Sequence, residues 1–219
     1  MHRSLELAIQ RSRNPPAAYL HQPLASLIDT PLAVRVGGSF TYPPSNPSNS
    51  PALRPEGIDR LLLIAGGVGI NPLISIFASL IHGPATHRPK EIHFLYGTKA
   101  ASPSLDPQEI LFLPRLMDLV SMSAAPLDVT LSLFLTGSGY DEGERIEDGK
   151  LPNTTLARRM GEQDLLGALD GWRGGAGREG RDSTVAYVCG TPSMTDQYVD
   201  LLGKQEGMHK ERVLCEKWW

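Results

Sequence analysis

The sequence predicts an α/β fold, with a five-stranded parallel sheet covered by helices on both faces and a smaller β region ahead of it. From residue 58 onward, short continuous apolar runs alternate with segments whose apolar residues recur at helical spacing. Continuous apolar strands suit a sheet buried on both faces, and strands separated by helices run parallel. A glycine-rich turn joins the first of these strands to the first helix.

The first part of the chain predicts two strands and an exposed linker. Residues 4–10 and 32–42 alternate apolar and polar side chains, which is typical of strands. Residues 43–57 are dense in Pro, Ser and Asn and lack periodicity, which indicates a linker. Two strands do not form a stable unit alone. We therefore expect a domain boundary near residue 55, with domains over residues 1–55 and 56–219.

The second domain is expected to contain the following elements in chain order. The strands are residues 61–65, 91–97, 129–136, 184–190 and 212–219, and the helices are residues 72–82, 109–120 and 193–205. Residues 136–184 break the alternation and are rich in Gly and charge, so loops are expected there. A short helix over residues 160–169 interrupts them, because Glu162 and Asp164 suit a first helical turn.

Composition excludes several classes of protein. The 219 residues are 41% hydrophobic and carry a net charge of -3, so no basic field for nucleic acid exists. The longest apolar run is too short to span a bilayer, so no transmembrane segment is expected. Cys189 and Cys215 lack metal-ligand spacing, and no metal site is expected. A reducing compartment follows, cytoplasmic or mitochondrial, and the N-terminus does not resemble a signal peptide.

The glycine turn predicts an anion site at the start of a helix. Gly66, Gly67 and Gly69 let the backbone turn sharply and let a ligand approach closely, with Val68 between them. The first N–H groups of a helix favour a phosphate, and Asn71 and Pro72 lie in that first turn. The turn lacks the acidic residue of the common dehydrogenase fingerprint. A turn that only shapes the chain remains the alternative.

A second turn is expected at the same edge of the sheet. The strand that ends at Cys189 continues into Gly190, Thr191 and Pro192, where another helix begins. Ligands of parallel sheets bind at the carboxyl ends of the strands, so both turns are expected to face one crevice. Cys189 is alternatively a small buried hydrophobic residue.

Three further groups of residues are candidates for this site. Tyr96, Gly97, Thr98 and Lys99 end the second strand, and Lys99 either meets an adenosine ribose or phosphate or lies in solvent. Arg158 and Arg159 are expected to face solvent, and one of them to steer a phosphate as the alternative. Glu216, Trp218 and Trp219 close the chain, and the two tryptophans stack on a flat ligand or contact a partner protein.

Five motifs in order, AGGVGINP, HFLYGTK, LFLT, YVCGTPSM and EKWW, resemble the nicotinamide-binding half of the ferredoxin-NADP reductase family. Within that family the likeness is greatest to the oxidoreductase NAD-binding domain-containing proteins, and it covers about residues 58–219. The resemblance implies a Rossmann-like sheet that binds NAD or NADP. It implies that Gly66, Gly67 and Gly69 hold the pyrophosphate, that Tyr96, Gly97 and Lys99 lie near the adenosine ribose, that Cys189 and Gly190 lie beside the nicotinamide, and that Glu216 and the terminal aromatics cover a flavin.

Residues 4–42 are similar to the last part of that family's flavin barrel, which makes the expected N-terminal region a partial antiparallel β-barrel. The family's RxYS flavin motif is not found, so the resemblance implies a shortened FAD domain. The implied function is hydride transfer between nicotinamide and FAD, with Cys189 and Glu216 as catalytic residues and an electron acceptor that the sequence does not identify. The alternatives are a non-enzymatic NAD(P)-binding or regulatory module and a scaffold.

Overall fold

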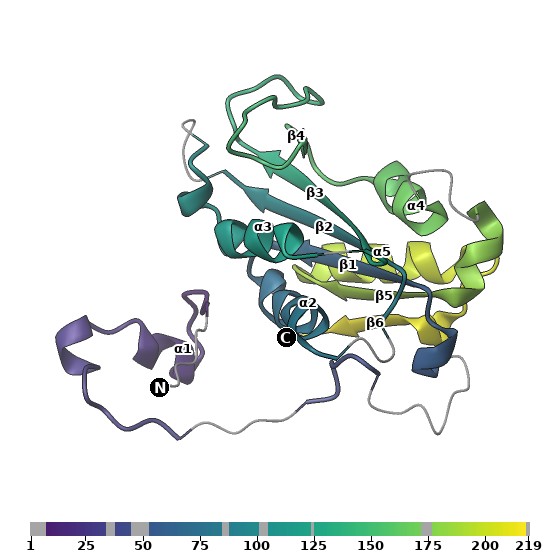
Figure 1. Cartoon of the computed structure of the whole chain (residues 1–219). Helices are drawn as coiled ribbons and strands as arrows, with labels where there is room; N and C mark the ends of the chain where they lie inside the picture. The colour runs from purple at the N-terminus through teal and green to yellow at the C-terminus, as the bar shows by residue number, and fades with distance from the viewer. Residues whose placement is uncertain are drawn as a thin grey trace. The chain divides into compact units, whose positions relative to one another are not determined.

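The computed structural model of the chain describes residues 8–33, 38–44, 53–84, 88–100, 105–123, 125–171 and 177–217 (Figure 1). Contacts between residues divide the chain into two compact units, Met1–Ser39 and Phe40–Trp219. The second unit contains the sheet and carries the candidate site.

The first unit contains helix α1 (Pro15–Leu20) and the 3₁₀ turn η1 (Leu24–Ser26). Proline at the start of α1 suits a first helical turn, where its missing N–H would have no partner. In the segments predicted as strands, the described residues 8–10, 32–33 and 38–42 do not have strand conformation. The rest of those segments lies outside the described residues, and the barrel assignment stays a prediction.

The second unit is built on a parallel sheet of six strands in the order β4-β3-β2-β1-β5-β6. The strands are β1 (Arg60–Gly66), β2 (Glu91–Lys99), β3 (Asp128–Thr136), β4 (Thr154–Leu156), β5 (Thr184–Cys189) and β6 (Val213–Glu216). The parallel sheet confirms the prediction, but the predicted number of five strands was one too few. The additional strand β4 lies where loops were expected, because its three residues contain no apolar run.

Four helices cover the sheet: α2 (Ile70–His82), α3 (Leu113–Ser121), α4 (Glu162–Asp170) and α5 (Pro192–Gly203). Short 3₁₀ helices are η3 (Pro55–Gly57), η4 (Gly67–Gly69), η5 (Pro107–Glu109), η6 (Gly177–Ser183) and η7 (Lys210–Arg212). Helix α3 begins four residues later than predicted, with Pro114 in its first turn. Phe112, just before the helix, has left-handed backbone with φ +57°, and Pro114 lacks the N–H that a further upstream turn would need, so α3 cannot extend to residue 109.

Alternate residues of each strand enter two separate apolar cores. Leu61 and Leu63 of β1 pack with α2 and α3, whereas Leu62 and Ile64 pack with α4 and α5. Figure 1 shows these two pairs of helices on opposite faces of the sheet. All residues of β1 and β5 are buried, as expected for the central strands of a sheet with two covered faces.

The segment at residues 40–42 packs on the same face as α2. The ring of Phe40 meets that of Tyr187 edge-on, with centroids 5.1 Å apart, and the Tyr187 hydroxyl donates to the carbonyl of Thr41 at 2.6 Å. Burial raises the pKa of Tyr187 far above its usual value, so this donor stays protonated. These residues belong to the same compact unit as the sheet, which starts at Phe40, and the domain boundary near residue 55 stays a prediction.

Both edges of the sheet are short. On its outer side, β4 forms an antiparallel bridge between Leu156 and Arg145, and the N–H of Ile146 donates to the carbonyl of Thr155 at 2.9 Å. The opposite edge strand, β6, has four residues. Within the described part of the chain, none of the helices has the length and apolarity that crossing a membrane would need.

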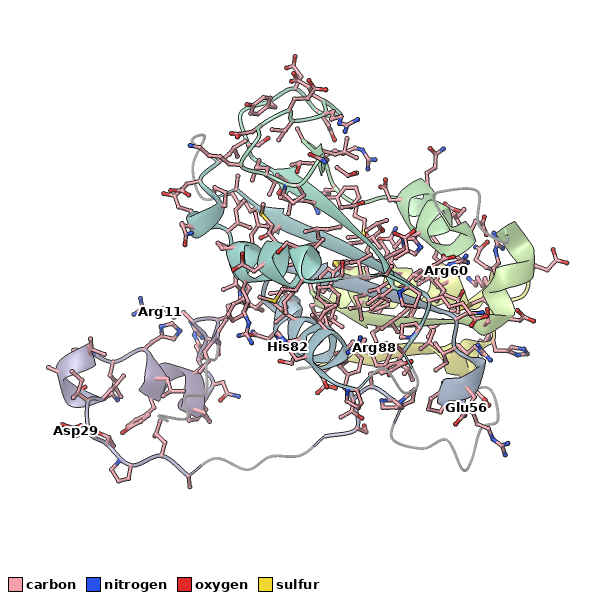
Figure 2. All side chains as sticks on the ribbon, viewed as in Figure 1. Arg11, Asp29, Glu56, Arg60, His82 and Arg88 are labelled. Carbon is pink, nitrogen blue, oxygen red and sulfur yellow. The ribbon has the colours of Figure 1, made fainter. Side chains whose placement is uncertain are left out.

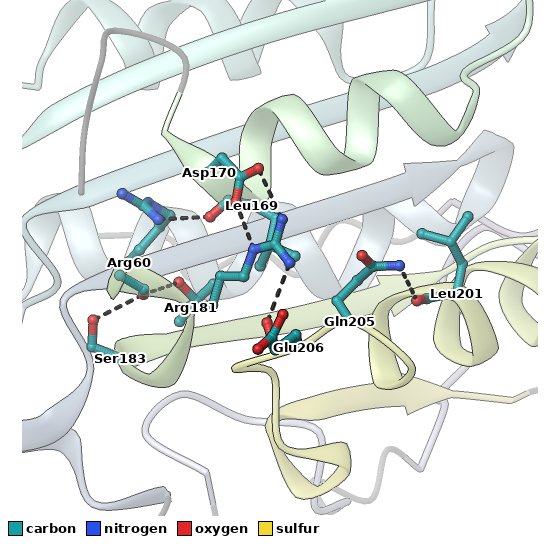
Figure 3. A network of polar contacts seen from close by, with 10 residues as sticks. Arg60, Leu169, Asp170, Arg181, Ser183, Leu201, Gln205 and Glu206 are labelled. Atoms are coloured by element: carbon teal, nitrogen blue, oxygen red, sulfur yellow. Dashed lines mark hydrogen bonds and ion pairs between the residues drawn. The ribbon is translucent and has the colours of Figure 1, made fainter. Parts of the chain in front are cut away.

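Polar side chains gather at the amino-terminal end of the strands, away from the glycine turns. Arg60, labelled in Figure 2, donates to Glu91 at 2.8 Å and to the carbonyl of Leu169 at 2.6 Å. Figure 3 shows Arg181 binding both carboxylate oxygens of Asp170, at 2.6 and 2.9 Å, and the carbonyl of Glu206. These contacts fasten the end of α4 to β1 and to η6, and η6 to the turn after α5.

Candidate functional site

The strand order reverses between β1 and β5, and the predicted site residues lie at this point. From β1 the chain builds outward through β2 and β3 on one side, and through β5 and β6 on the other. The register aligns Glu216, Cys189, Ala65 and Tyr96 across four neighbouring strands. Open parallel sheets bind ligands beyond the carboxyl ends of their strands at such a reversal.

The loop from β1 to α2 is the glycine turn. Gly67 has φ +53°, a left-handed conformation that favours glycine, and a Cβ added there would meet no atom within 4 Å. The side chain of Asn71 donates to the carbonyl of Val68 at 3.0 Å, which closes the loop. No described side chain caps the N-terminus of α2, and its first N–H groups donate to the carbonyls of Gly67 and Val68 in η4. The positive end of the α2 dipole still points toward the glycine turn.

The two predicted turns contact each other directly. A Cβ on Gly69 would collide with the carbonyl of Cys189 and would lie 2.7 Å from the nitrogen of Gly190. A Cβ on Gly66 would lie 3.3 Å from the Cα of Gly190. We call the contact of Gly66, Gly69, Cys189 and Gly190 the glycine junction. Glycine is required at Gly69 because the backbone of the other turn occupies the space of a side chain.

Met194 completes the glycine junction and was not among the predicted site residues. Its sulfur lies 2.5 Å from the position that a Cβ on Gly66 would take, and its methyl carbon 2.6 Å from the corresponding position on Gly190. Met194 belongs to the motif YVCGTPSM, which was the only signal for it in the sequence. Its role depends on the approach of two distant turns, which no local pattern shows.

The four predicted site residues at the end of β2 differ in how deeply they are buried. Tyr96 is fully buried, and its hydroxyl donates to the carbonyl of Leu111 at 3.1 Å. Burial raises the pKa of Tyr96 to about 12. Gly97 and Thr98 are half-buried, and Lys99 is exposed, with its Cε 3.5 Å from the Cβ position of Gly137. Of these four, the Tyr96 ring belongs to the core, whereas Lys99 offers its charge at the surface.

Cys189 and Glu216 face different surroundings although they are paired in the sheet. The side chain of Cys189 is fully buried in the core beneath α2, so its backbone, and not its thiol, forms the glycine junction. Glu216 is half-buried at the end of β6. Lys217 fastens this end to α5 through its ion pair with Asp196 at 2.6 Å. The predicted ligand residues Trp218 and Trp219 lie outside the described residues.

The turn that opens α5 is exposed. Thr191 precedes the helix and Pro192 is its first residue, and both are exposed. No described side chain caps this N-terminus either. Two helices therefore begin beside the glycine junction with uncapped ends, one from each of the turns predicted to face the same ligand.

Arg158, predicted to face solvent, is half-buried and has a carboxylate partner. Its guanidinium binds both carboxylate oxygens of Asp164 and lies 5.3 Å from the centre of the Phe134 ring. The hydrogen bonds with Asp164 raise the pKa of Arg158. Arg159 is exposed, as expected. Met160 follows in the core, and its methyl carbon lies 3.7 Å from the Cβ position of Gly97.

A separate hollow of about 290 Å³ lies in the loop after β3, lined by Arg145, Ile146, Glu147, Asp148, Gly149, Pro152 and Asn153. Its charged groups are two carboxylates and one guanidinium, and that guanidinium already donates to the carbonyl of Asn153 at 2.7 Å. This composition does not suit a phosphate. Among the described residues, His, Cys, Asp and Glu form no cluster that could hold a metal ion.

Two reductases are among the solved structures with likeness to the chain. The cytochrome b5 reductase domain of Ulva prolifera nitrate reductase is 18% identical with a TM-score of 0.46, covering 73% of this chain and 50% of that one. A mutant ferredoxin-NADP+ reductase from Plasmodium falciparum is 17% identical with a TM-score of 0.43, covering 79% of this chain and 55% of that one.

Curated relatives match almost the whole chain, although no family model matches it. Oxidoreductase NAD-binding domain-containing protein 1 of Danio rerio is 32% identical, covering 99% of this chain and 69% of that protein. The Homo sapiens protein of the same name is 33% identical, covering 99% of this chain and 61% of that protein. The chain thus spans about two thirds or less of these relatives. It belongs to the family of oxidoreductase NAD-binding domain-containing protein 1.

Proposed function

We propose that this chain binds NAD(P)H at the glycine junction and forms the nicotinamide-binding part of a flavin-dependent oxidoreductase. The observation that carries the proposal is the direct contact of the Gly66–Gly69 and Cys189–Gly190 turns where the strand order reverses. Relatives named for an NAD-binding domain support it.

The residues present fit a dinucleotide. The backbone at Gly67 is open where a Cβ would stand, so a pyrophosphate can approach the main chain closely. The N-terminus of α5, which no described side chain caps, offers N–H groups to its negative charge, and both α2 and α5 begin here with the positive ends of their dipoles. Lys99 is exposed at the end of β2, where the adenosine half of the ligand is proposed to lie.

The reaction in this proposal is hydride transfer: the hydride would pass from C4 of the nicotinamide to N5 of the flavin when both groups are bound. The chain's own residues would bind these two groups and orient them. The glycine junction fixes the pyrophosphate and, on the β5 side, the nicotinamide end. Glu216 lies on β6 beside it and is proposed to cover the flavin together with Trp218 and Trp219. Cys189 contributes its backbone in this proposal, because its thiol lies in the core.

Binding of the dinucleotide is tested by titrating the full chain with NADH and NADPH while following the ligand's fluorescence. The variant Val68→Asp places a carboxylate on the exposed tip of the glycine turn, where it repels the pyrophosphate at no cost in core packing. Val68→Thr, which has the same shape and no charge, is its control. We expect at least tenfold weaker binding for Val68→Asp and nearly unchanged binding for Val68→Thr.

The flavin part of the proposal needs a separate experiment. Purified protein loaded with FAD is mixed with NADH in a stopped-flow instrument, and the flavin absorbance is followed. Bleaching of the flavin supports the oxidoreductase. A colourless protein that binds NADH but retains no FAD would instead assign the chain to a dinucleotide-binding module. Failure to bind either dinucleotide would overturn the proposal as a whole.

A further inference from the structure

The side chain of Met194 occupies one space that belongs to two turns. Its sulfur and methyl carbon lie 2.5 and 2.9 Å from the Cβ position of Gly66. The same two atoms lie 2.9 and 2.6 Å from the Cβ position of Gly190. The thioether therefore fills the place of both missing side chains at once, where the two turns meet.

The backbone of Met194 belongs to a third element, helix α5, and not to either turn. Met194 is the third residue of α5, and the N–H of Thr195 beside it donates to the carbonyl of Thr191 at 2.9 Å. The side chain is half-buried and packs against the core between the sheet and α5. An unbranched, flexible thioether suits this place, because only the terminal Sδ and Cε atoms of Met194 reach the two glycines.

The geometry assigns Met194 as a positioning residue that sets the spacing of the two turns for the nicotinamide half of a bound dinucleotide. The assignment rests on the proposed function. Met194 contacts the turns of β1 and β5, whereas the adenosine half is proposed to lie over β2, on the other side of β1. Shortening Met194 lets the Gly190 turn shift relative to Gly66, and this loosens the nicotinamide half more than the adenosine half.

A purely structural role for Met194 predicts a different result. Loss of a packed methionine lowers the stability of the whole unit, and it would weaken the binding of every ligand fragment alike. The ratio of the NADH affinity to the AMP affinity therefore separates the two roles. NADH spans both halves of the ligand, whereas AMP carries only the adenosine half.

The first experiment compares the full wild-type chain with Met194→Ala by calorimetric titration of NADH and AMP. We expect Met194→Ala to weaken NADH binding about tenfold and AMP binding less than twofold. Met194→Gln, an unbranched side chain of similar length, is expected to restore NADH affinity to within about threefold of wild type. If Met194→Ala does not fold, Met194→Leu replaces it, because its branch at Cγ is expected to disturb the same spacing.

Met208→Ala is the matched control. Met208 is a buried methionine of the same core, 6% exposed, and it lies in the turn after α5, away from the glycine junction. Its truncation is expected to lower the melting temperature while leaving the ratio of NADH to AMP affinity unchanged.

The shared space is tested by a rescue. Gly66→Ala alone is expected to destabilise the fold, because the new Cβ would collide with Met194. Adding Met194→Ala removes these atoms and leaves the Cα of Gly190, at 3.3 Å, as the nearest atom, so stability is expected to recover. Gly66 is in extended backbone with φ -124°, so alanine adopts its conformation without strain.

The outcomes separate the two claims. Wild-type protein that binds neither ligand would overturn the proposed function, and this inference with it. Wild-type protein that binds NADH, with equal loss of NADH and AMP in Met194→Ala, would overturn the positioning role and leave the proposed function standing. A Gly66→Ala variant that Met194→Ala does not rescue would equally contradict the shared space.

Discussion

Both carboxylate oxygens of Asp164 bind the guanidinium of Arg158, with N–O distances of 2.6 and 2.7 Å. Asp164 is only 8% exposed, and its Oδ2 also accepts the N–H of Gly161 at 2.8 Å. The carboxylate of Asp164 therefore caps the N-terminus of α4 and also fixes the segment between β4 and α4. This arrangement gives Arg158 a structural partner in place of a phosphate.

Asp164→Ala is expected to lower the free energy of unfolding by about 3 kcal/mol, because it removes a helix cap and leaves Arg158 unpaired. Arg158→Ala is expected to cost about half as much, since Asp164 keeps its bond to Gly161 and Arg158 is partly exposed. Urea unfolding followed by circular dichroism measures both. Equal losses in the two variants would show that the cap contributes nothing.

Gly69→Ala tests the close approach of the two turns. Its Cβ would collide with backbone atoms of Cys189 and Gly190, which cannot rotate away as a side chain can. We expect the melting temperature to fall by roughly 10 °C, as several kcal/mol of strain in a domain of this size would produce. Gly149→Ala is the control, because its Cβ meets no atom within 4 Å. An unchanged melting temperature for Gly69→Ala would contradict the contact.

Lys99→Ala tests which dinucleotide the chain prefers. The exposed ammonium at the end of β2 is expected to meet the 2′-phosphate that distinguishes NADPH from NADH. Its loss should weaken NADPH binding about fivefold, the equivalent of an exposed charged contact of about 1 kcal/mol, and NADH binding less than twofold. Lys150→Ala, an exposed lysine in the loop after β3, controls for net charge. Equal effects on both dinucleotides would remove Lys99 from the phosphate site.

His93 is expected to make stability depend on pH. Burial lowers the pKa of His93, and the charge of Arg60 lowers it further, against the opposing influence of Glu91 and Asp128. Its Nδ1 lies 2.6 Å from the hydroxyl of Thr130, and its Nε2 is 3.5 Å from Glu91. The unfolded chain therefore takes up the proton at higher pH than the folded one. The stabilisation that neutral His93 contributes is therefore fully present above pH 6.5, the ordinary pKa of histidine, and is lost as the pH falls below that value.

The carboxylate of Glu91 titrates in a lower range. Burial raises the pKa of Glu91, but its hydrogen bond with Arg60 and the Arg60 charge lower it overall, so its stabilisation is lost only below pH 4.5. Melting curves between about pH 7.5 and about pH 5.5 therefore isolate His93. We expect a falling melting temperature in wild type and a flatter profile in His93→Gln. A profile of the same slope in both proteins would assign the dependence elsewhere.

The central strands and the glycine turn were predictable because their signals are local. Continuous apolar residues in β1 and β5 predict burial on both faces, and the structure buries every residue of both strands. Glycines next to a helical pattern predict the turn before α2. Strand β4 was missed because three residues carry too little pattern, and it pairs only once β3 offers an open edge.

Contacts between distant segments could not be read from the sequence. Met194 occupies its place because two turns meet beside α5, and Arg158 finds Asp164 only after the chain bends at Gly161. Tyr96 stands in the row of candidate site residues, yet its ring enters the core toward Leu111. Position in a motif indicates the strand end, whereas the direction of each side chain is decided by packing.

The short outer strands of the sheet bear on how the protein meets other chains. An exposed strand edge is a template for pairing with a foreign strand, which leads to aggregation or to β-augmentation by a partner. Here β6 offers four residues, and the outer side of β4 is already engaged by Arg145 and Ile146. Self-association by strand addition is thereby disfavoured at both edges, which directs any partner toward loops and helix faces.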